Sequence, residues 1–195
     1  MNFSSPILAR LGLLLLAGWL LAAPAFAADT VKLTRPPQWR PPENTQIVTM
    51  AELVQLAHAQ LPGVPITASD VKFQLVSYQW LEEFVEWTWT FDREIGLDYV
   101  PESFDCDDYA MMFSLFSSRV ASLAGVKASP LVGRIVVRHD IAFGGVKATP
   151  GKNHALICVA TDRGIYIVEP QTNSPFRLVP LTKYKNRIWK LTLGG

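Results

Sequence analysis

The sequence predicts one α+β domain, with helices in its first half and antiparallel strands in its second. Apolar residues recur at helical spacing up to about residue 124, and runs of β-branched residues dominate from residue 131 onward. Helices that come before the strands, and do not alternate with them, are typical of the α+β class. A chain of 195 residues is long enough to bury its own core.

Residues 1–27 have the features of a signal peptide. Arg10 precedes an uncharged apolar run over 11–23, and Ala-Phe-Ala at 25–27 is a typical cleavage site. The run is shorter than the ~20 residues that a membrane-spanning helix needs. We expect cleavage before Ala28, a periplasmic or secreted product and no stable membrane anchor; an uncleaved anchor is the alternative.

The charge of the exported chain is balanced. The sequence holds 18 Lys and Arg against 17 Asp and Glu, and the signal peptide removes only Arg10. A balanced chain offers no broad basic surface, so we expect no nucleic-acid partner.

The first predicted element of the mature chain is an extended lead-in over 28–48, with four prolines around Trp39. The domain then runs over 49–195. Its first helix is predicted to begin after Thr49, which can form a capping box with Glu52, and to end before Pro62. Its apolar stripe comprises Leu53, Leu56, Ala57 and Leu61.

A second helix is predicted from about 77 to 93. Trp80, Phe84, Trp87 and Phe91 recur on it at spacings of four, three and four residues. Such an aromatic stripe is typical of a core. The alternative is that Trp80 and Trp87 form a substrate-binding wall.

The third helix is predicted to begin at Cys106 and to end at Gly125, with Asp105 as its N-cap and Asp108 three residues later. Strands are expected over 131–139, 154–160 and 165–168, with one or two more in 177–193.

Cys106, His154 and Glu169 have the side-chain types of an activated thiol nucleophile. The first turn of a helix favours an anion, so it favours the thiolate of Cys106. A histidine can hold that thiolate as an ion pair, and a third polar group can orient the imidazole. A two-residue turn at 162–163 would place His154, Glu169 and Gln171 on one face of a hairpin. Either of the last two could orient the imidazole, and we favour Glu169 because a carboxylate also stabilises imidazolium.

Three acids, Asp105, Asp107 and Asp108, surround Cys106 and disfavour its thiolate. The site therefore needs a cation, either His154 as imidazolium or a bound metal ion. An ordinary helix cap that needs no ion explains the acids equally well. His139 is the competing histidine, but no acid lies opposite it in a hairpin.

The second cysteine, Cys158, lies in an all-apolar run and is expected to be a small buried residue. A disulfide between Cys106 and Cys158 is the alternative in an exported chain.

Three motifs carry a resemblance to a known family: Asp-Cys-Asp-Asp-Tyr-Ala at 105–110, Asn-His-Ala at 153–155 and Val-Glu-Pro-Gln-Thr-Asn at 168–173. They resemble the papain-like cysteine peptidase domain at the C-terminus of a fungal agglutinin from Marasmius, in the papain and transglutaminase-like group. The resemblance covers residues from about 70 to 193.

The resemblance implies a papain-like fold with Cys106 as nucleophile, His154 as general base and Glu169 as third member. The chemistry itself requires no cofactor, but the resemblance makes calcium possible, with Asp107 and Asp108 as candidate ligands. The chain has no carbohydrate-binding domain, so lectin activity is not carried over. Gln74 and Gln79 lie at unsuitable spacings for the oxyanion-hole glutamine of papain-like enzymes.

The leading hypothesis is an exported cysteine peptidase or amidase that cleaves a peptide or protein through a thioester on Cys106, with Gln171 and Trp80 as substrate-binding candidates. Transglutaminase-like transfer of the acyl group to an amine is the second hypothesis. The third is a non-enzymatic binding module that exposes Trp80 and Trp87.

Overall fold

The computed structural model describes residues 33–43, 47–101, 103, 105–138, 149–171, 178–183 and 185–194. The predicted signal peptide and the competing histidine at position 139 lie outside these residues. The part from Leu33 onward forms one unit. No described helix is long and apolar enough to cross a membrane.

Three helices form where the sequence predicts them: α2 (Met50–Gln60), α3 (Tyr78–Glu94) and α4 (Cys106–Leu123). The predicted capping box of α2 is present, with the Glu52 backbone N–H donating to Thr49 Oγ1 at 3.3 Å and the Thr49 N–H donating to the Glu52 carboxylate at 2.8 Å. Ser77 caps α3, and Gly125 takes a positive φ of 80° just after α4. These signals act within one turn, which explains why the sequence alone reveals them.

The main sheet has six strands in the order β2-β9-β5-β6-β7-β8, and a smaller sheet has the order β1-β3-β4. The strands of the main sheet are β2 (Ile66–Ala68), β5 (Val132–Arg138), β6 (Asn153–Thr161), β7 (Gly164–Val168), β8 (Val179–Pro180) and β9 (Ile188–Leu193). Those of the smaller sheet are β1 (Ile47–Thr49), β3 (Lys72–Gln74) and β4 (Ser129–Pro130).

The α+β class is confirmed, but the prediction of a purely antiparallel sheet is wrong. The β2–β9 and β3–β4 pairs are parallel, so both sheets are mixed. The strands that the sequence analysis missed are two or three residues long, which is too short for a period-2 pattern.

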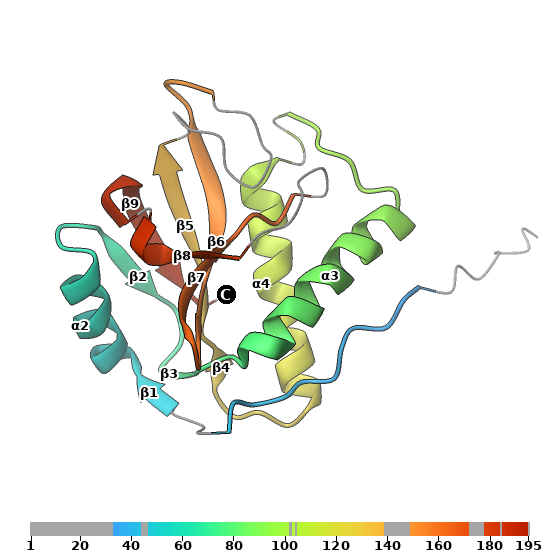
Figure 1. The fold of residues 1–195 in the computed structure, drawn as a ribbon, viewed down its shortest axis with the longest axis horizontal. Coiled ribbons are helices and arrows are strands. Elements are labelled where there is room, and N and C mark those ends of the chain that lie inside the picture. The colour runs from blue at the N-terminus through green and yellow to red at the C-terminus, as the bar shows by residue number, and fades with distance from the viewer. Residues whose placement is uncertain are drawn as a thin grey trace, which may run out of the picture. The chain divides into compact units, whose positions relative to one another are not determined.

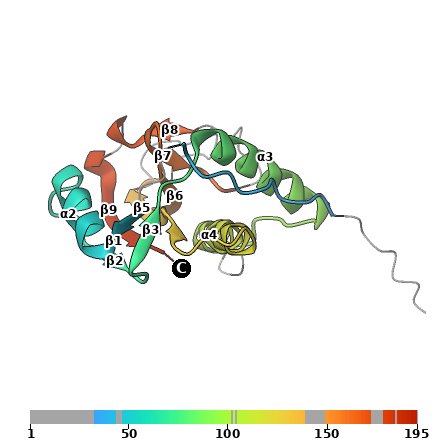
Figure 2. The same ribbon diagram turned by 90° about the horizontal axis from the view of Figure 1, so that it is seen from below.

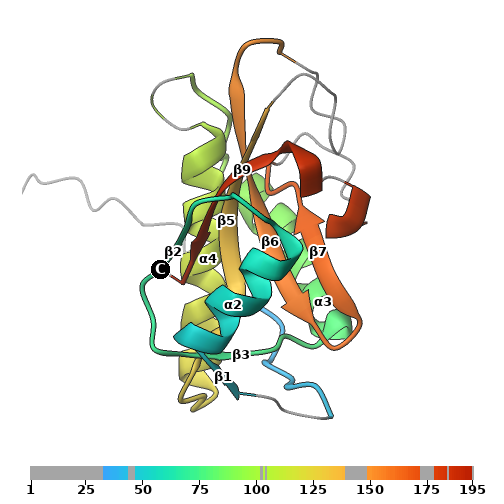
Figure 3. The same ribbon diagram turned by 90° about the vertical axis from the view of Figure 1, so that its left-hand side faces the viewer.

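Helices cover both faces of the main sheet: α3 and α4 lie on one side and α2 on the other (Figures 1 and 2). Figure 3 shows α2 crossing in front of the central strands. Alternate residues of β6 enter two separate cores, Leu156 and Cys158 on the α2 side and Ala155 and Ile157 on the α3 and α4 side. A strand buried on both faces reads as an unbroken apolar run, as β6 does.

The aromatic stripe of α3 is core, as the default interpretation predicts. Trp80 is 0 % exposed and Trp87 is buried, so the alternative of a binding wall made by these two residues is wrong. The lead-in contributes to this core, because Trp39 packs on Trp80 with ring centroids 4.6 Å apart. In α2 the predicted stripe fails at Leu56, which is 59 % exposed.

Candidate functional site

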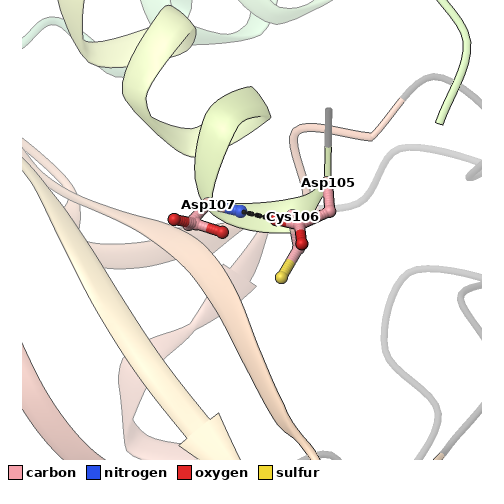
Figure 4. A group of neighbouring side chains, drawn as sticks. All are labelled: Asp105, Cys106 and Asp107. Carbon is pink, nitrogen blue, oxygen red and sulfur yellow. Dashed lines mark hydrogen bonds between the residues drawn. The ribbon is translucent and has the colours of Figure 1, made fainter. Parts of the chain in front are cut away.

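Cys106 is the first residue of α4, and the cap in front of it is built from its neighbours. The Asp105 carboxylate accepts the backbone N–H of Asp107 at 3.3 Å, and Asp108 accepts the N–H of Asp105 at 3.1 Å. Asp105 is therefore the N-cap, as predicted, and Asp108 completes a capping box with it. Figure 4 shows the result: the Cys106 sulfur and the Asp107 carboxylate leave the helix start in different directions.

The hairpin that carries the other two residues has the predicted register. Thr161 pairs with Gly164, and Ile157 pairs with Val168. The pairing ends there because β7 ends at Val168, so Glu169 and Pro170 lie beyond the strand. β6 begins four residues before Ile157, and this first part of β6 is not paired with β7. His154 therefore lies on a part of β6 that has β5 on one side and no β7 partner on the other.

His154 and Glu169 meet as the register requires. His154 Nε2 lies 2.5 Å from Glu169 Oε2, and both residues are at most 2 % exposed. The second carboxylate oxygen, Oε1, accepts the backbone N–H of Gln171 at 3.1 Å. Glu169 is thus the group that orients the imidazole. Gln171 supports Glu169 through its backbone.

The thiol of Cys106 completes the chain of contacts. Its sulfur accepts the backbone N–H of Ala155 at 3.4 Å, at the stretch of β6 that β7 leaves uncovered. The sulfur also hydrogen-bonds the imidazole of His154. Because Nε2 is bound to Glu169, we assign the contact with the sulfur to Nδ1. The structure brings Cys106, His154 and Glu169 together in the predicted order.

The electrostatics of the site favour imidazolium. Burial of His154 lowers its pKa, but the hydrogen bonds and charges of Cys106 and Glu169 outweigh burial and raise the pKa to about 9. His154 therefore carries a proton at neutral pH. The imidazolium is one of the two cations that could balance the three acids beside the Cys106 thiolate.

The described residues do not assemble the predicted calcium ligands. Asp108 is bound in the helix cap, and the grouping that could hold an ion consists of Asp105, Cys106 and Asp107. Calcium takes six to eight oxygen ligands, whereas this grouping offers two carboxylates and a soft thiol. The donor set therefore does not fit calcium, and calcium binding stays a prediction from the resemblance.

Cys158 is separate from this site. Both cysteines are free, so the disulfide alternative is wrong. Cys158 packs in the core on the α2 side, whereas Cys106 packs against the core on the α3 and α4 side. Burial raises the pKa of the Cys158 thiol to about 12, so it stays protonated and unreactive at neutral pH.

The structure also separates both candidate glutamines from the thiol. Gln74 lies on β3 and pairs with β4, the strand that follows the C-terminal end of α4. Cys106 is at the N-terminal end of that helix, about 27 Å away along its axis. Gln79 contacts Glu83 on its own helix at 3.4 Å. Within the described residues, the cap of α4 supplies acceptors for the N–H groups of Asp107 and Asp108 but none for the N–H of Cys106. That N–H is therefore the candidate oxyanion donor.

Two residues of α3 were not singled out from the sequence. The Trp89 indole N–H donates to the carbonyl of Gln171 at 3.3 Å and so holds the segment that carries Glu169. Asp92 is 1 % exposed, and burial raises its pKa to about 7. It lies seven residues after apolar Val85, at the spacing of one helix face, and this is the signal that could have revealed it.

No protein-family model matches the chain, and no curated protein matches it in sequence. Solved structures do match. One is described as "PSL1a-E64 complex", at 15 % identity and a TM-score of 0.52, over 75 % of this chain and 51 % of that one. Another is Polyporus squamosus lectin bound to a human-type influenza-binding epitope, at 15 % identity and a TM-score of 0.49, over 75 % of this chain and 49 % of that one.

The chain thus spans about half the length of these structures. The second is named a lectin, and neither title names a papain-like peptidase, so the comparisons do not confirm one. At 15 % identity, the likeness establishes a shared α+β fold and nothing about activity.

Proposed function

We propose that the chain is a cysteine-dependent hydrolase of peptide or amide bonds on a papain-like fold. Cys106 is the nucleophile, His154 the general base and Glu169 the residue that orients the imidazole. The observation that carries the proposal is the continuous contact from the Cys106 sulfur through the imidazole to the buried carboxylate. A buried histidine clamped between a thiol and an acid has no evident structural purpose, because an apolar residue there would avoid two desolvated charges.

The contacts suit each proton transfer of the reaction. The Cys106 thiolate attacks the carbonyl carbon, and the His154 Nδ1 proton passes to the amine as the C–N bond breaks. A thioester on Cys106 remains. A water molecule then gives a proton to Nδ1 and attacks the thioester, which releases the acid and returns the thiolate–imidazolium pair. Glu169 holds the imidazole throughout and keeps Nδ1 aimed at the sulfur.

The acceptor of the acyl group decides between two chemistries. Water gives hydrolysis, and an amine gives transglutaminase-like transfer, with the same thioester in both. We favour hydrolysis because it needs no second substrate site. We further propose that the enzyme acts outside the cytoplasm, on the evidence of the signal peptide.

A binding module without catalysis is the second candidate, because one of the solved structures that resemble the chain is named a lectin. Trp80 and Trp87 cannot serve as its contacts, because both are buried in the core. A module of this kind would not depend on the Cys106 thiol.

The two candidates can be separated with E64, an epoxide that alkylates thiols. The hydrolase should gain one adduct per chain, located at Cys106 by peptide mass spectrometry. Cys158→Ala should react as the wild type does, whereas His154→Ala should react at least tenfold more slowly. A wild-type protein that is folded by circular dichroism and takes up no adduct would overturn the hydrolase and leave the binding module.

A further inference from the structure

Three basic side chains lie together on one face of the main sheet, and none of them takes part in the proposed reaction. Arg134 and Arg138 stand two residues before and after Val136 on β5, and Lys190 of β9 pairs directly with Val136. Alternation along β5 and pairing across to β9 place the three side chains on the same face. It is the face on which α3 and α4 lie, because Val132, in the same alternation, enters the core on that side.

The row of paired residues that crosses this basic cluster ends at the catalytic thiol. Lys190 pairs with Val136, Val136 pairs with Ala155 of β6, and the Ala155 N–H donates to the Cys106 sulfur at 3.4 Å. Neighbouring strands lie about 4.8 Å apart, so the backbone of Lys190 is about 10 Å from that of Ala155. An extended peptide advances about 3.3 Å per residue, so its scissile bond at Cys106 would lie two or three residues from the cluster.

The helices leave this part of the face open. Val132, toward the far end of β5, is buried beneath them, whereas Arg134 and Val136 are only half-buried. Arg138 and Lys190 are exposed. A ligand can therefore reach the three cations from solvent.

The charges of the basic cluster are not balanced by the acids around it. None of the three side chains makes an ion pair or a hydrogen bond with another described residue. The nearest acid is Asp107: a hydrogen bond with Asp105 raises the pKa of Asp107, and the Arg134 guanidinium opposes that rise. Asp107 thus offsets part of the charge of Arg134 and leaves Arg138 and Lys190 unpaired.

Unpaired cations on neighbouring strands repel one another, and an anion bound between them would remove that repulsion. Arginine binds a carboxylate through two parallel hydrogen bonds, and lysine adds a compact charge. Three cations suit the carboxylate of one side chain. They are few for a nucleic acid, whose binding proteins commonly contact about six to ten phosphates.

We propose that Arg134, Arg138 and Lys190 bind a carboxylate of the substrate, and that the enzyme selects peptides with a glutamate or aspartate two or three residues from the cleaved bond. The selection rests on the proposed hydrolase, whereas the binding of an acidic peptide does not.

Binding can be measured without chemistry on the full chain carrying Cys106→Ala. The probe is a fluorescent hexapeptide of alternating glycine and glutamate with blocked ends, and the matched peptides carry glutamine or lysine in place of glutamate. Fluorescence anisotropy should give an affinity at least fivefold higher for the glutamate peptide than for the glutamine peptide, with the lysine peptide weakest. Unlabelled hexathymidylate should displace the probe less well than the unlabelled glutamate peptide does. Equal or better displacement by the DNA would mean a nucleic-acid site and would overturn the proposal.

Substitutions on three strands provide the matched control. Arg138→Gln and Lys190→Gln should each weaken binding of the glutamate peptide at least threefold, and Arg138→Glu combined with Lys190→Glu should abolish it. Lys72→Gln removes the same charge from an exposed lysine on β3, which lies beside the strand that follows the far end of α4, so its effect should stay below twofold. Equal affinity for the three peptides, or equal effects of Lys72→Gln and Lys190→Gln, would overturn the proposal.

Protection of the thiol tests whether the basic cluster serves the active site. At saturation, the glutamate peptide should slow the initial rate of E64 alkylation of wild-type Cys106 at least threefold, and Lys190→Gln should remove most of this protection. Binding without protection would overturn the recognition role.

The same measurements keep the two proposals apart. Binding of the glutamate peptide that depends on Lys190, in a protein that takes up no E64, would retain the acidic-peptide site and refute the hydrolase. An adduct at Cys106 without discrimination among the peptides would retain the hydrolase and refute the role of the basic cluster.

Discussion

The Glu169→Gln substitution tests the catalytic site with almost no change of shape. The carboxylate accepts two hydrogen bonds, Oε2 from His154 and Oε1 from the Gln171 N–H. A glutamine has one oxygen and one NH₂ group in those places, so one of the two donors must face another donor. A buried donor without an acceptor costs about 1–3 kcal/mol. We expect the free energy of unfolding to fall by that amount, with a drop in Tm of a few degrees.

The same substitution should change the reactivity of the thiol. The charge of Glu169 helps to raise the pKa of His154 to about 9, so its loss moves that pKa back toward 6.5. The proton of the imidazolium is then lost at a lower pH, and the upper limb of a profile of Cys106 alkylation against pH should shift downward. At neutral pH the alkylation rate should fall roughly tenfold, which corresponds to about 1.4 kcal/mol.

Iodoacetamide labelling followed by peptide mass spectrometry measures that rate at Cys106, with buried Cys158 as an unreactive control in the same chain. Chemical denaturation measures the stability change separately. A folded Glu169→Gln variant with the alkylation profile of the wild type would refute the role assigned to the carboxylate.

Three further outcomes are expected, two from the structure and one from the sequence. Cys158→Ala should lower the free energy of unfolding by roughly 1–2 kcal/mol, because it leaves a small cavity. Alkylation of Cys106 should not change, since the two cysteines contact different cores. A loss of Cys106 alkylation in a folded variant would contradict this separation. Burial raises the pKa of Asp92 from 3.8 to about 7, so between these pH values the folded state binds a proton that the unfolded state has lost. The free energy of unfolding should therefore fall as pH rises from 4 to 7, and Asp92→Asn should remove this dependence in chemical denaturation curves. An unchanged dependence of stability on pH in the variant would point to another group. The exported protein should begin at Ala28 or within a residue or two of it by mass spectrometry, whereas a full-length membrane-bound product would show that the apolar segment is an anchor.

The parts of this structure that sequence reasoning finds are local. The capping boxes of α2 and α4 join residues three apart, and the short turn between Thr161 and Gly164 sets the register that brings His154 to Glu169. Each depends on contacts within a few positions of the chain, where spacing alone is decisive.

The parts that sequence reasoning misses join distant segments. Nothing in the three-residue strands β2 and β3 indicates a parallel partner more than fifty residues away. The same holds for Trp39, which packs on Trp80, and for Trp89, which bonds to Gln171 across 82 positions. Such contacts depend on how the elements pack, which no local pattern encodes.

The pH dependence of Cys106 alkylation in the wild-type protein tests the central claim most directly. A thiolate held by His154 should react at pH 6 at least tenfold faster than Cys106 of the unfolded chain, and its rate should stay level until pH approaches 9, where the imidazolium loses its proton. A rate that is low at pH 6 and rises with a midpoint near 8.5, as for a free thiol, would contradict the thiolate–imidazolium pair and with it the proposed hydrolase.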